Sequence, residues 1–164
     1  MSTPEFVLAL REKIGHVPLW LTGATAIVLR NEEILLVRRA DTGEWSPVTG
    51  IVDPGEEPAD AAVREALEEA DVVVRAERLA WVHVLDPLTY ANGDQARYLD
   101  LVFICSWVSG DPAPADGENT AAAWWPLADL PPIPETYAAR IRSALHNTGA
   151  TVFEQRRPVA TPDN

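Results

Sequence analysis

The segment from Pro58 to Ala70 constrains the fold of this chain more than any other. Its sequence, PADAAVREALEEA, has proline in the first turn and an alanine-rich interior without glycine, which predicts an α-helix. One side of this helix is apolar at helical spacing and is expected to pack on a sheet. The residues on that side are Ala62, Val63, Ala66, Leu67 and Ala70.

The same helix carries three glutamates, Glu65, Glu68 and Glu69, at positions i, i+3 and i+4. This spacing places their carboxylates on one face, where they repel one another. Arg64, four residues before Glu68, supplies only one positive charge. The remaining negative charge leaves room for a hard divalent cation with oxygen ligands, such as Mg²⁺ or Mn²⁺. A solvated charged face would show the same local pattern, so the helix alone does not decide between the two interpretations.

The wider segment from residue 50 to residue 72 narrows the interpretation. Its informative residues are Gly50, Glu56, Arg64, Glu65, Ala66, Glu68, Glu69 and Val72. In identity and spacing they resemble the signature of the Nudix hydrolases at all but one of its specified positions. The exception is Asp71, where the family usually has a glycine that ends the helix in a left-handed conformation. Aspartate tolerates that conformation better than most residues do.

The resemblance implies a metal-dependent hydrolase that cleaves the pyrophosphate link of a nucleoside diphosphate joined to another group. Metal ions would polarise the diphosphate and activate a water molecule. Glu65, Glu68 and Glu69 would be catalytic and would bind Mg²⁺, with Mn²⁺ as a substitute. Glu65 would serve either as a ligand or as the base. Arg64 would orient the glutamates, and the carbonyl of Gly50 would be a further metal ligand.

Two further acids are candidates for the metal site. Glu56 is expected to have a supporting electrostatic or structural role. Many family members add an acid from a later loop, and this chain has Ala123 where such a residue sits in some relatives. Glu118 or Asp116, in the loop spanning residues 111–120, would take its place. An ordinary exposed loop acid remains the alternative.

Substrate-binding candidates lie outside the signature, and they are Arg38, Arg39 and Trp45. The two arginines alternate at the end of a strand, so only one of them can face a cleft and contact phosphate. A surface salt bridge is the competing interpretation for that arginine. Pro87 and Tyr90 stand at distances from the signature that the family associates with ADP-ribose and with dinucleoside polyphosphates, respectively. They also suit an ordinary turn, so nucleoside triphosphates and ADP-ribose-like sugar nucleotides both remain open.

The remaining pattern predicts an α+β fold, a Nudix-like α/β/α sandwich with a mixed β-sheet between helices. We expect an N-terminal helical extension at 1–19, a Nudix hydrolase domain at 20–147 and a C-terminal tail at 148–164. Within them the hydrophobic pattern and the turn residues indicate these elements. Helices are expected at 3–15, 58–70 and 134–146, and strands at 22–30, 33–39, 71–85, 96–110 and 121–128.

Charge and hydropathy restrict the partners. The net charge of −12 is opposite in sign to a surface that grips long nucleic acid. No apolar run is long enough to cross a bilayer, and the N-terminus is a poor signal peptide, so we expect a cytoplasmic protein that acts on a small nucleotide. The extra helix and the surplus tryptophans are compatible with a homodimer. A non-catalytic nucleotide-binding Nudix module is the alternative function, although such a module has no need for the full carboxylate set.

Overall fold

The computed structural model describes residues 3–115, 117–146 and 149–154. In this part of the chain, nine strands form one mixed sheet. The helices are α1 (Glu5–Ile14), α2 (Pro58–Ala70) and α3 (Glu135–His146). The strands are β1 (Leu19–Arg30), β2 (Glu33–Arg39), β3 (Trp45–Ser46), β4 (Val48–Ile51), β5 (Val73–Val84), β6 (Leu88–Thr89), β7 (Gln95–Ser109), β8 (Asn119–Pro126) and β9 (Val152–Phe153).

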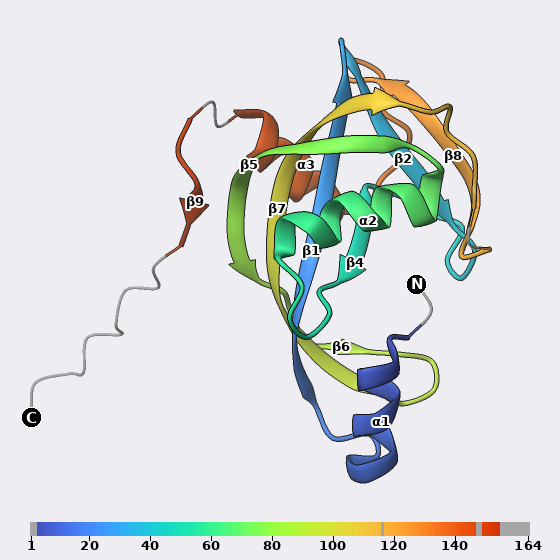
Figure 1. Ribbon diagram of the computed structural model, residues 1–164, viewed down its shortest axis with the longest axis vertical. Helices are drawn as coiled ribbons and strands as arrows, with labels where there is room; N and C mark the ends of the chain where they lie inside the picture. The colour runs from blue at the N-terminus through green and yellow to red at the C-terminus, as the bar shows by residue number, and fades with distance from the viewer. Residues whose placement is uncertain (1–2, 116, 147–148, 155–164) are drawn as a thin grey trace, which may run out of the picture.

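The centre of the sheet is the parallel pair of β1 and β7, two long and strongly curved strands (Figure 1). The other edge of β1 is divided between two partners. Its middle pairs with β4, from Gly23 to Ala26, and its end pairs with β2, at Leu29 and Arg30. Strand β5 continues the sheet on the far side of β7. The division of β1 brings the short strand β4, and the signature residues that follow it, to the middle of the molecule.

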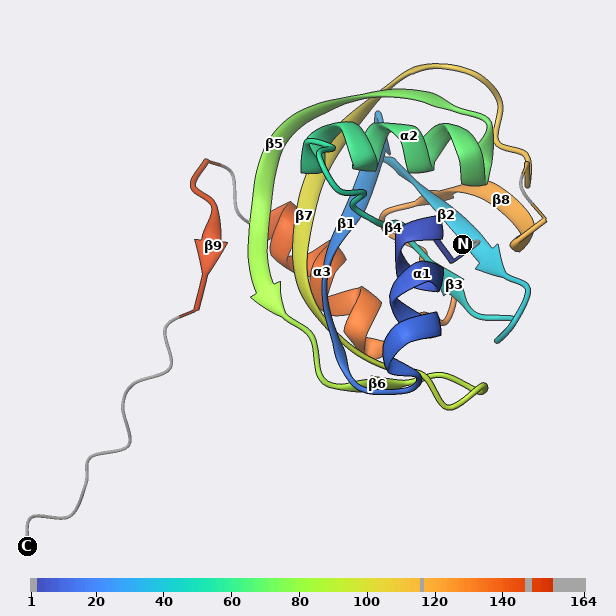
Figure 2. The same cartoon turned by 60° about the horizontal axis from the view of Figure 1, so that its bottom comes forward.

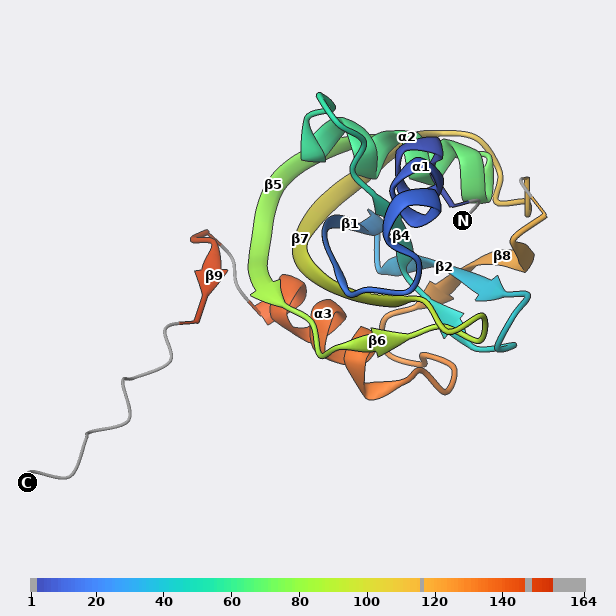
Figure 3. The same cartoon turned by 90° about the horizontal axis from the view of Figure 1, so that it is seen from below.

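Helices α2 and α3 cover opposite faces of this sheet (Figure 3). The alanines of α2 pack into one cluster of buried residues with β1, β2, β4, β5 and β7. Ile141 and Ala144 of α3 pack into a second cluster, with Ile27 and Val102 among its buried members. The predicted sandwich of a mixed sheet between helices is confirmed. Among the described residues no helix is both long and apolar enough to span a membrane.

Several local predictions need correction. Leu67, expected on the packed side of α2, is 49% exposed, whereas Ala61 is fully buried. The buried stripe is therefore rotated toward the glutamates. Strands β6 and β9 were not foreseen, because a two-residue strand is too short to show an alternating pattern. Both form by pairing with long strands, β6 with β7 and β9 with β5.

Helix α1 packs on the molecule through a third, smaller cluster. Its Val7 is 5% exposed and lies with Leu21, Ile51 and Tyr98 of β1, β4 and β7. Figure 2 shows the helix in front of β4. The N-terminal helix, predicted at 3–15, is confirmed, and it covers the edge of β4 where the signature segment begins.

The end of α2 has the geometry that the sequence predicted. Asp71 adopts a left-handed conformation, with φ of 55° and ψ of 34°, and its amide donates to the carbonyl of Leu67 at 3.0 Å. The helix thus ends in the usual way without the usual glycine, at a steric cost borne by the Cβ of Asp71.

We expect Asp71→Gly to raise the free energy of unfolding by about 1 kcal/mol, because glycine adopts this conformation without that steric cost. Urea denaturation followed by circular dichroism measures the change. Asp71→Ala is the matched control and should lower the same free energy, since alanine keeps the Cβ and loses the polar side chain. A glycine variant less stable than the parent would contradict the assignment of strain to this residue.

Candidate active site

The guanidinium group of Arg64 is the centre of the signature segment. Its Nε and Nη2 donate to the two carboxylate oxygens of Glu56 at 2.8 and 2.9 Å. Its Nη1 donates to Glu65 at 2.8 Å and to Glu68 at 3.0 Å, and Nη2 also reaches the carbonyl of Ile51 at 3.2 Å. The pKa of Arg64 is raised, first by Glu56 and then by Glu65 and Glu68. One cation thus holds three carboxylates, and Glu56 contacts it through both of its oxygens.

Gly50 and Glu65 occupy adjoining space. A Cβ added to Gly50 would lie 2.0 Å from the carboxyl carbon of Glu65, closer than any real contact. Any side chain at position 50 would therefore displace this glutamate. Strand β4 holds Gly50 against Ala24 of β1, so the Glu65 carboxylate rests on the backbone at the centre of the sheet.

Burial changes the acidity of Glu65, which is 5% exposed. Removal from water raises its pKa from the ordinary 4.5 to about 7, although Arg64 acts in the opposite direction. The charge of Glu68 adds to the increase. A carboxylate in this environment gains stability from a neighbouring cation.

The three glutamates of α2 are not equivalent in burial. Glu65 and Glu69 are buried, at 5% and 3% exposure, whereas the side chain of Glu68 is 52% exposed and turned to Arg64. Among the residues that the structure describes, no three acidic, histidine or cysteine side chains are grouped so as to hold a metal ion. Joint coordination by all three glutamates would require rotation of side chains.

The chemistry of these groups nevertheless fits a hard divalent cation. The donors are carboxylate oxygens and a backbone carbonyl, which Mg²⁺ and Mn²⁺ prefer. The buried carboxylate of Glu65, with its raised pKa, favours positive charge at this place. The residues that would hold the ion are Glu65, Glu68, Glu69 and, through its carbonyl, Gly50.

A cavity of about 440 Å³ opens beside Gly50. Of the two adjacent arginines, Arg39 lines it, whereas Arg38 is exposed and donates to the carbonyl of Gly43 at 2.9 Å. Trp45 is not among the described lining residues. It packs edge to face on Trp125, 5.4 Å between ring centroids, within the cluster on the α3 side. Of the three residues predicted to bind substrate, only Arg39 therefore lines the cavity.

Arg39 stands at one end of this cavity, close to the signature helix. It donates to both oxygens of Asp41, at 3.0 and 2.8 Å. Its pKa is raised, first by Asp41 and also by Tyr137 and Glu69. The carbonyl of Glu118 accepts from the amide of Ala40 at 2.9 Å, which places the candidate loop acid at the same end of β2. Its proposed alternative, Asp116, lies outside the described residues.

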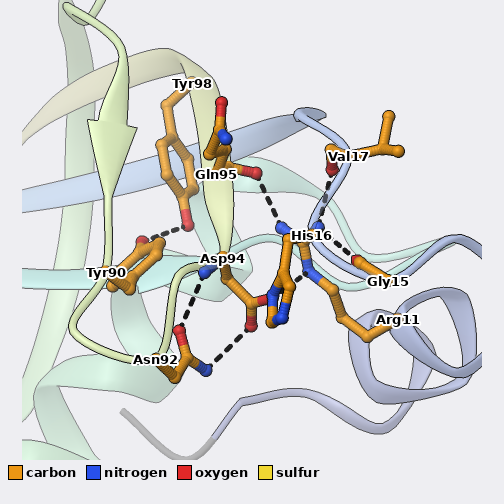
Figure 4. A network of polar contacts seen from close by, with 9 residues as sticks. All are labelled: Arg11, Gly15, His16, Val17, Tyr90, Asn92, Asp94, Gln95 and Tyr98. Atoms are coloured by element: carbon orange, nitrogen blue, oxygen red, sulfur yellow. Dashed lines mark hydrogen bonds and ion pairs between the residues drawn. The ribbon is translucent and has the colours of Figure 1, made fainter.

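Helix α1 and the hairpin of β6 and β7 form another part of the cavity wall. Tyr90 of this hairpin was singled out from the sequence, whereas Arg11 and Asp94 were not. Arg11 donates to the carbonyls of Gly15, Val17 and Gln95 at 3.0, 2.6 and 2.7 Å (Figure 4). A carboxylate oxygen of Asp94 forms an ion pair with Nε of the same guanidinium at 3.3 Å and contacts His16 at 2.8 Å. These contacts fix α1 to the start of β7 and so complete the wall.

A buried polar network borders the cavity between these ends. Asp100 of β7 is 3% exposed and contacts Thr25, His83 and Arg140. His83 is a strand histidine satisfied by its neighbours, through its 2.9 Å contact with Asp100 and its stacking on Trp81. Sequence reasoning missed Asp100 and Arg140, since contacts between residues 40 positions apart leave no local pattern.

Comparison with known proteins agrees with the family resemblance of residues 50–72. A family model described as the NUDIX domain matches residues 20–147. A MutT-like protein of Streptomyces ambofaciens is 30% identical over 137 residues, which cover 82% of this chain and 83% of that protein.

An NAD-capped RNA hydrolase of Pseudomonas syringae is 35% identical over 114 residues. The match covers 66% of this chain but 37% of that protein, so the chain spans only part of the length of this relative. Among solved structures, an ADP-ribose pyrophosphatase of Streptococcus suis superposes with a TM-score of 0.61 at 25% identity. That match covers 77% of this chain and 90% of the other.

The pKa of Glu65 generates a prediction for the metal-free protein. Because the folded pKa is raised, the stabilising contribution is fully present below about pH 4.5 and is lost as the pH rises through about 7. Between about pH 5 and pH 8, the free energy of unfolding should fall by about 2 kcal/mol more in the parent than in Glu65→Gln. Urea denaturation in a chelating buffer measures both profiles. Parallel profiles would show that Glu65 titrates normally, and added Mg²⁺ should restore the stability of the parent at high pH.

Proposed function

The chain belongs to the NUDIX family, and we propose that it is a metal-dependent hydrolase that cleaves the pyrophosphate link of a nucleoside diphosphate joined to another group. One observation carries the proposal. Arg64 gathers Glu56, Glu65 and Glu68, and Glu65 lies against the backbone of Gly50, which lines a cavity large enough for part of a nucleotide. A helix that only faced solvent would leave its glutamates exposed, whereas Glu65 and Glu69 are buried.

The residues of the chain have separate tasks in this proposal. Glu65, Glu68 and Glu69 bind Mg²⁺ or Mn²⁺ together with the Gly50 carbonyl, and Arg64 keeps the carboxylates in place between turnovers. The bound ion supplies electrostatic stabilisation of the phosphate charge and acidifies water. Arg39, which lines the cavity, would donate hydrogen bonds to a phosphate after leaving Asp41.

The bond changes of this reaction are those of a hydrolysis. The oxygen of a water molecule bonds to one phosphorus while the bridging P–O bond breaks, and the second phosphate leaves with the bridging oxygen. The proton of the water passes to a carboxylate of the signature. Where Glu65 does not bind the ion, it is suited to accept this proton, because burial raises its pKa to about 7 in the metal-free protein.

The cavity and the relatives support a substrate class. NAD-capped RNA and ADP-ribose, named for two of them, both carry a nucleoside diphosphate joined to a further group. The present chain spans only part of the first relative, so a panel of small molecules is the proper test. We propose nucleoside triphosphates and ADP-ribose-like compounds as its members, assayed with Mg²⁺ and with Mn²⁺ by release of phosphate or nucleoside monophosphate. Metal-independent binding without turnover across the panel would instead support a non-catalytic nucleotide-binding module.

Glu69→Gln should lower kcat by about 100-fold or more, because it removes a charged oxygen ligand while preserving the volume of a buried side chain. Steady-state kinetics on the best substrate of the panel measures the loss, and circular dichroism checks the fold. Glu57→Gln, an exposed glutamate just before the same helix, is the matched control and should retain the parental kcat. Near-parental activity of Glu69→Gln would remove Glu69 from the metal site.

A further inference from the structure

Arg140 is a buried cation that the proposed hydrolysis does not use. It lies on α3 and is 5% exposed. Its Nε donates to Oδ2 of Asp100 at 2.8 Å, and His83 contacts the same oxygen at 2.9 Å. The hydroxyl of Thr25 donates to the other oxygen, Oδ1, at 2.9 Å. Asp100 is therefore held by three neighbours and fixes the orientation of the guanidinium.

The outer side of this guanidinium faces the cavity. Tyr137 lies one helical turn before Arg140, with its ring centroid 5.0 Å from the Cζ of Arg140, and both residues line the cavity. Neither Nη1 nor Nη2 makes a hydrogen bond or ion pair with any residue that the structure describes, although the side chain is almost wholly buried. The protein thus presents a rigid pair of N–H donors to whatever enters, and such a fork suits two acceptors placed side by side.

The charge around the cavity decides what kind of acceptor fits. Its described lining contains three arginines and three aspartates, so their formal charges cancel. Each arginine has its own acidic partner, with Arg11 beside Asp94, Arg39 beside Asp41 and Arg140 beside Asp100. Asp100 is also too well held to release Arg140. A second dianionic phosphate would gain little here, and an uncharged group with two acceptors is favoured.

The sheet register gives the separation between Gly50 of the signature and Asp100, which holds Arg140. Gly50 of β4 pairs with Ala24 of β1, and the adjacent Gly23 pairs with Asp100 of β7. Because neighbouring strands lie about 4.8 Å apart, the backbone of Asp100 is roughly 10 Å across the sheet from Gly50. Gly50 and Arg140 line the same cavity, so a nucleoside whose phosphates lie at Gly50 can extend its base toward Arg140.

We propose that Arg140 binds the O6 and N7 acceptors of a guanine base, with Asp100 as the positioning residue, so that this chain prefers guanine nucleotides to adenine nucleotides. Adenine has an amino donor where guanine has O6, and this donor would face the N–H groups of Arg140. The proposal rests on the proposed function only in taking the base to belong to the same substrate.

The test is binding of GMP and AMP to the metal-free full chain, measured by titration calorimetry. Neither ligand contains a pyrophosphate link, so the result is independent of hydrolysis and of the metal site. We expect GMP to bind about tenfold more tightly than AMP, the size expected for one bidentate contact. Equal affinities, tighter binding of AMP, or binding of neither nucleotide at millimolar concentrations would overturn the proposal.

Two variants separate a base contact from other roles of Arg140. Arg140→Lys keeps a cation that can reach Asp100 but removes the fork, and it should bring the GMP-to-AMP affinity ratio close to one. Arg142→Lys, on the exposed side of the same helix, should keep the parental ratio. A folded Arg140→Lys protein that retains the ratio, or one that loses affinity for GMP and AMP equally as for a phosphate contact, would contradict recognition of the base.

Discussion

The rest of the site depends on the contact between the Glu65 carboxylate and the backbone of Gly50. A carboxylate can be buried there only because position 50 lacks a side chain. Burial raises the pKa of Glu65, and Arg64 offsets part of the energetic cost while it holds Glu56 and Glu68. Helix α2, strand β4 and the following turn are therefore joined through polar groups, whereas the alanines behind them supply the apolar packing. Removing the Glu65 carboxylate would leave Arg64 with only Glu56 and Glu68 as its carboxylate partners among the described residues.

Features carried by consecutive residues were predictable from the sequence. The bounds of α2 follow from its proline and alanines, and the left-handed end at Asp71 follows from the family pattern. The contact between Arg64 and Glu68 is likewise a matter of helical spacing. Periodicity was less informative about rotation, since it placed Leu67 on the packed side instead of Ala61. Small alanines and large leucines count alike in such a pattern, but only the small ones let α2 approach the sheet closely.

Contacts between distant residues were not predictable. Asp100 and Arg140 meet because β7 and α3 pack together, and neither residue stands in a recognisable local motif. The same holds for the division of β1 between β4 and β2, which is set by the register of three strands. Trp45 appeared suited to a nucleotide because it precedes the signature, yet the short strand β3 directs it to the opposite core. The signature part of the site thus follows from the local sequence, whereas the lining of the cavity is assembled by the fold.

The wall built by α1 has an evolutionary consequence. Arg11 reaches three backbone carbonyls, so the side chains of Val17 and Gln95 can change without loosening this anchor, whereas Gly15 has a φ of 61° that favours glycine. The neighbouring hairpin contributes Leu88, Tyr90 and Asn92 to the cavity. Mutational drift at these positions would alter the shape of the cavity while leaving the signature and the sheet untouched. Such an arrangement allows related chains to diverge in the compounds they accept while they keep one chemistry.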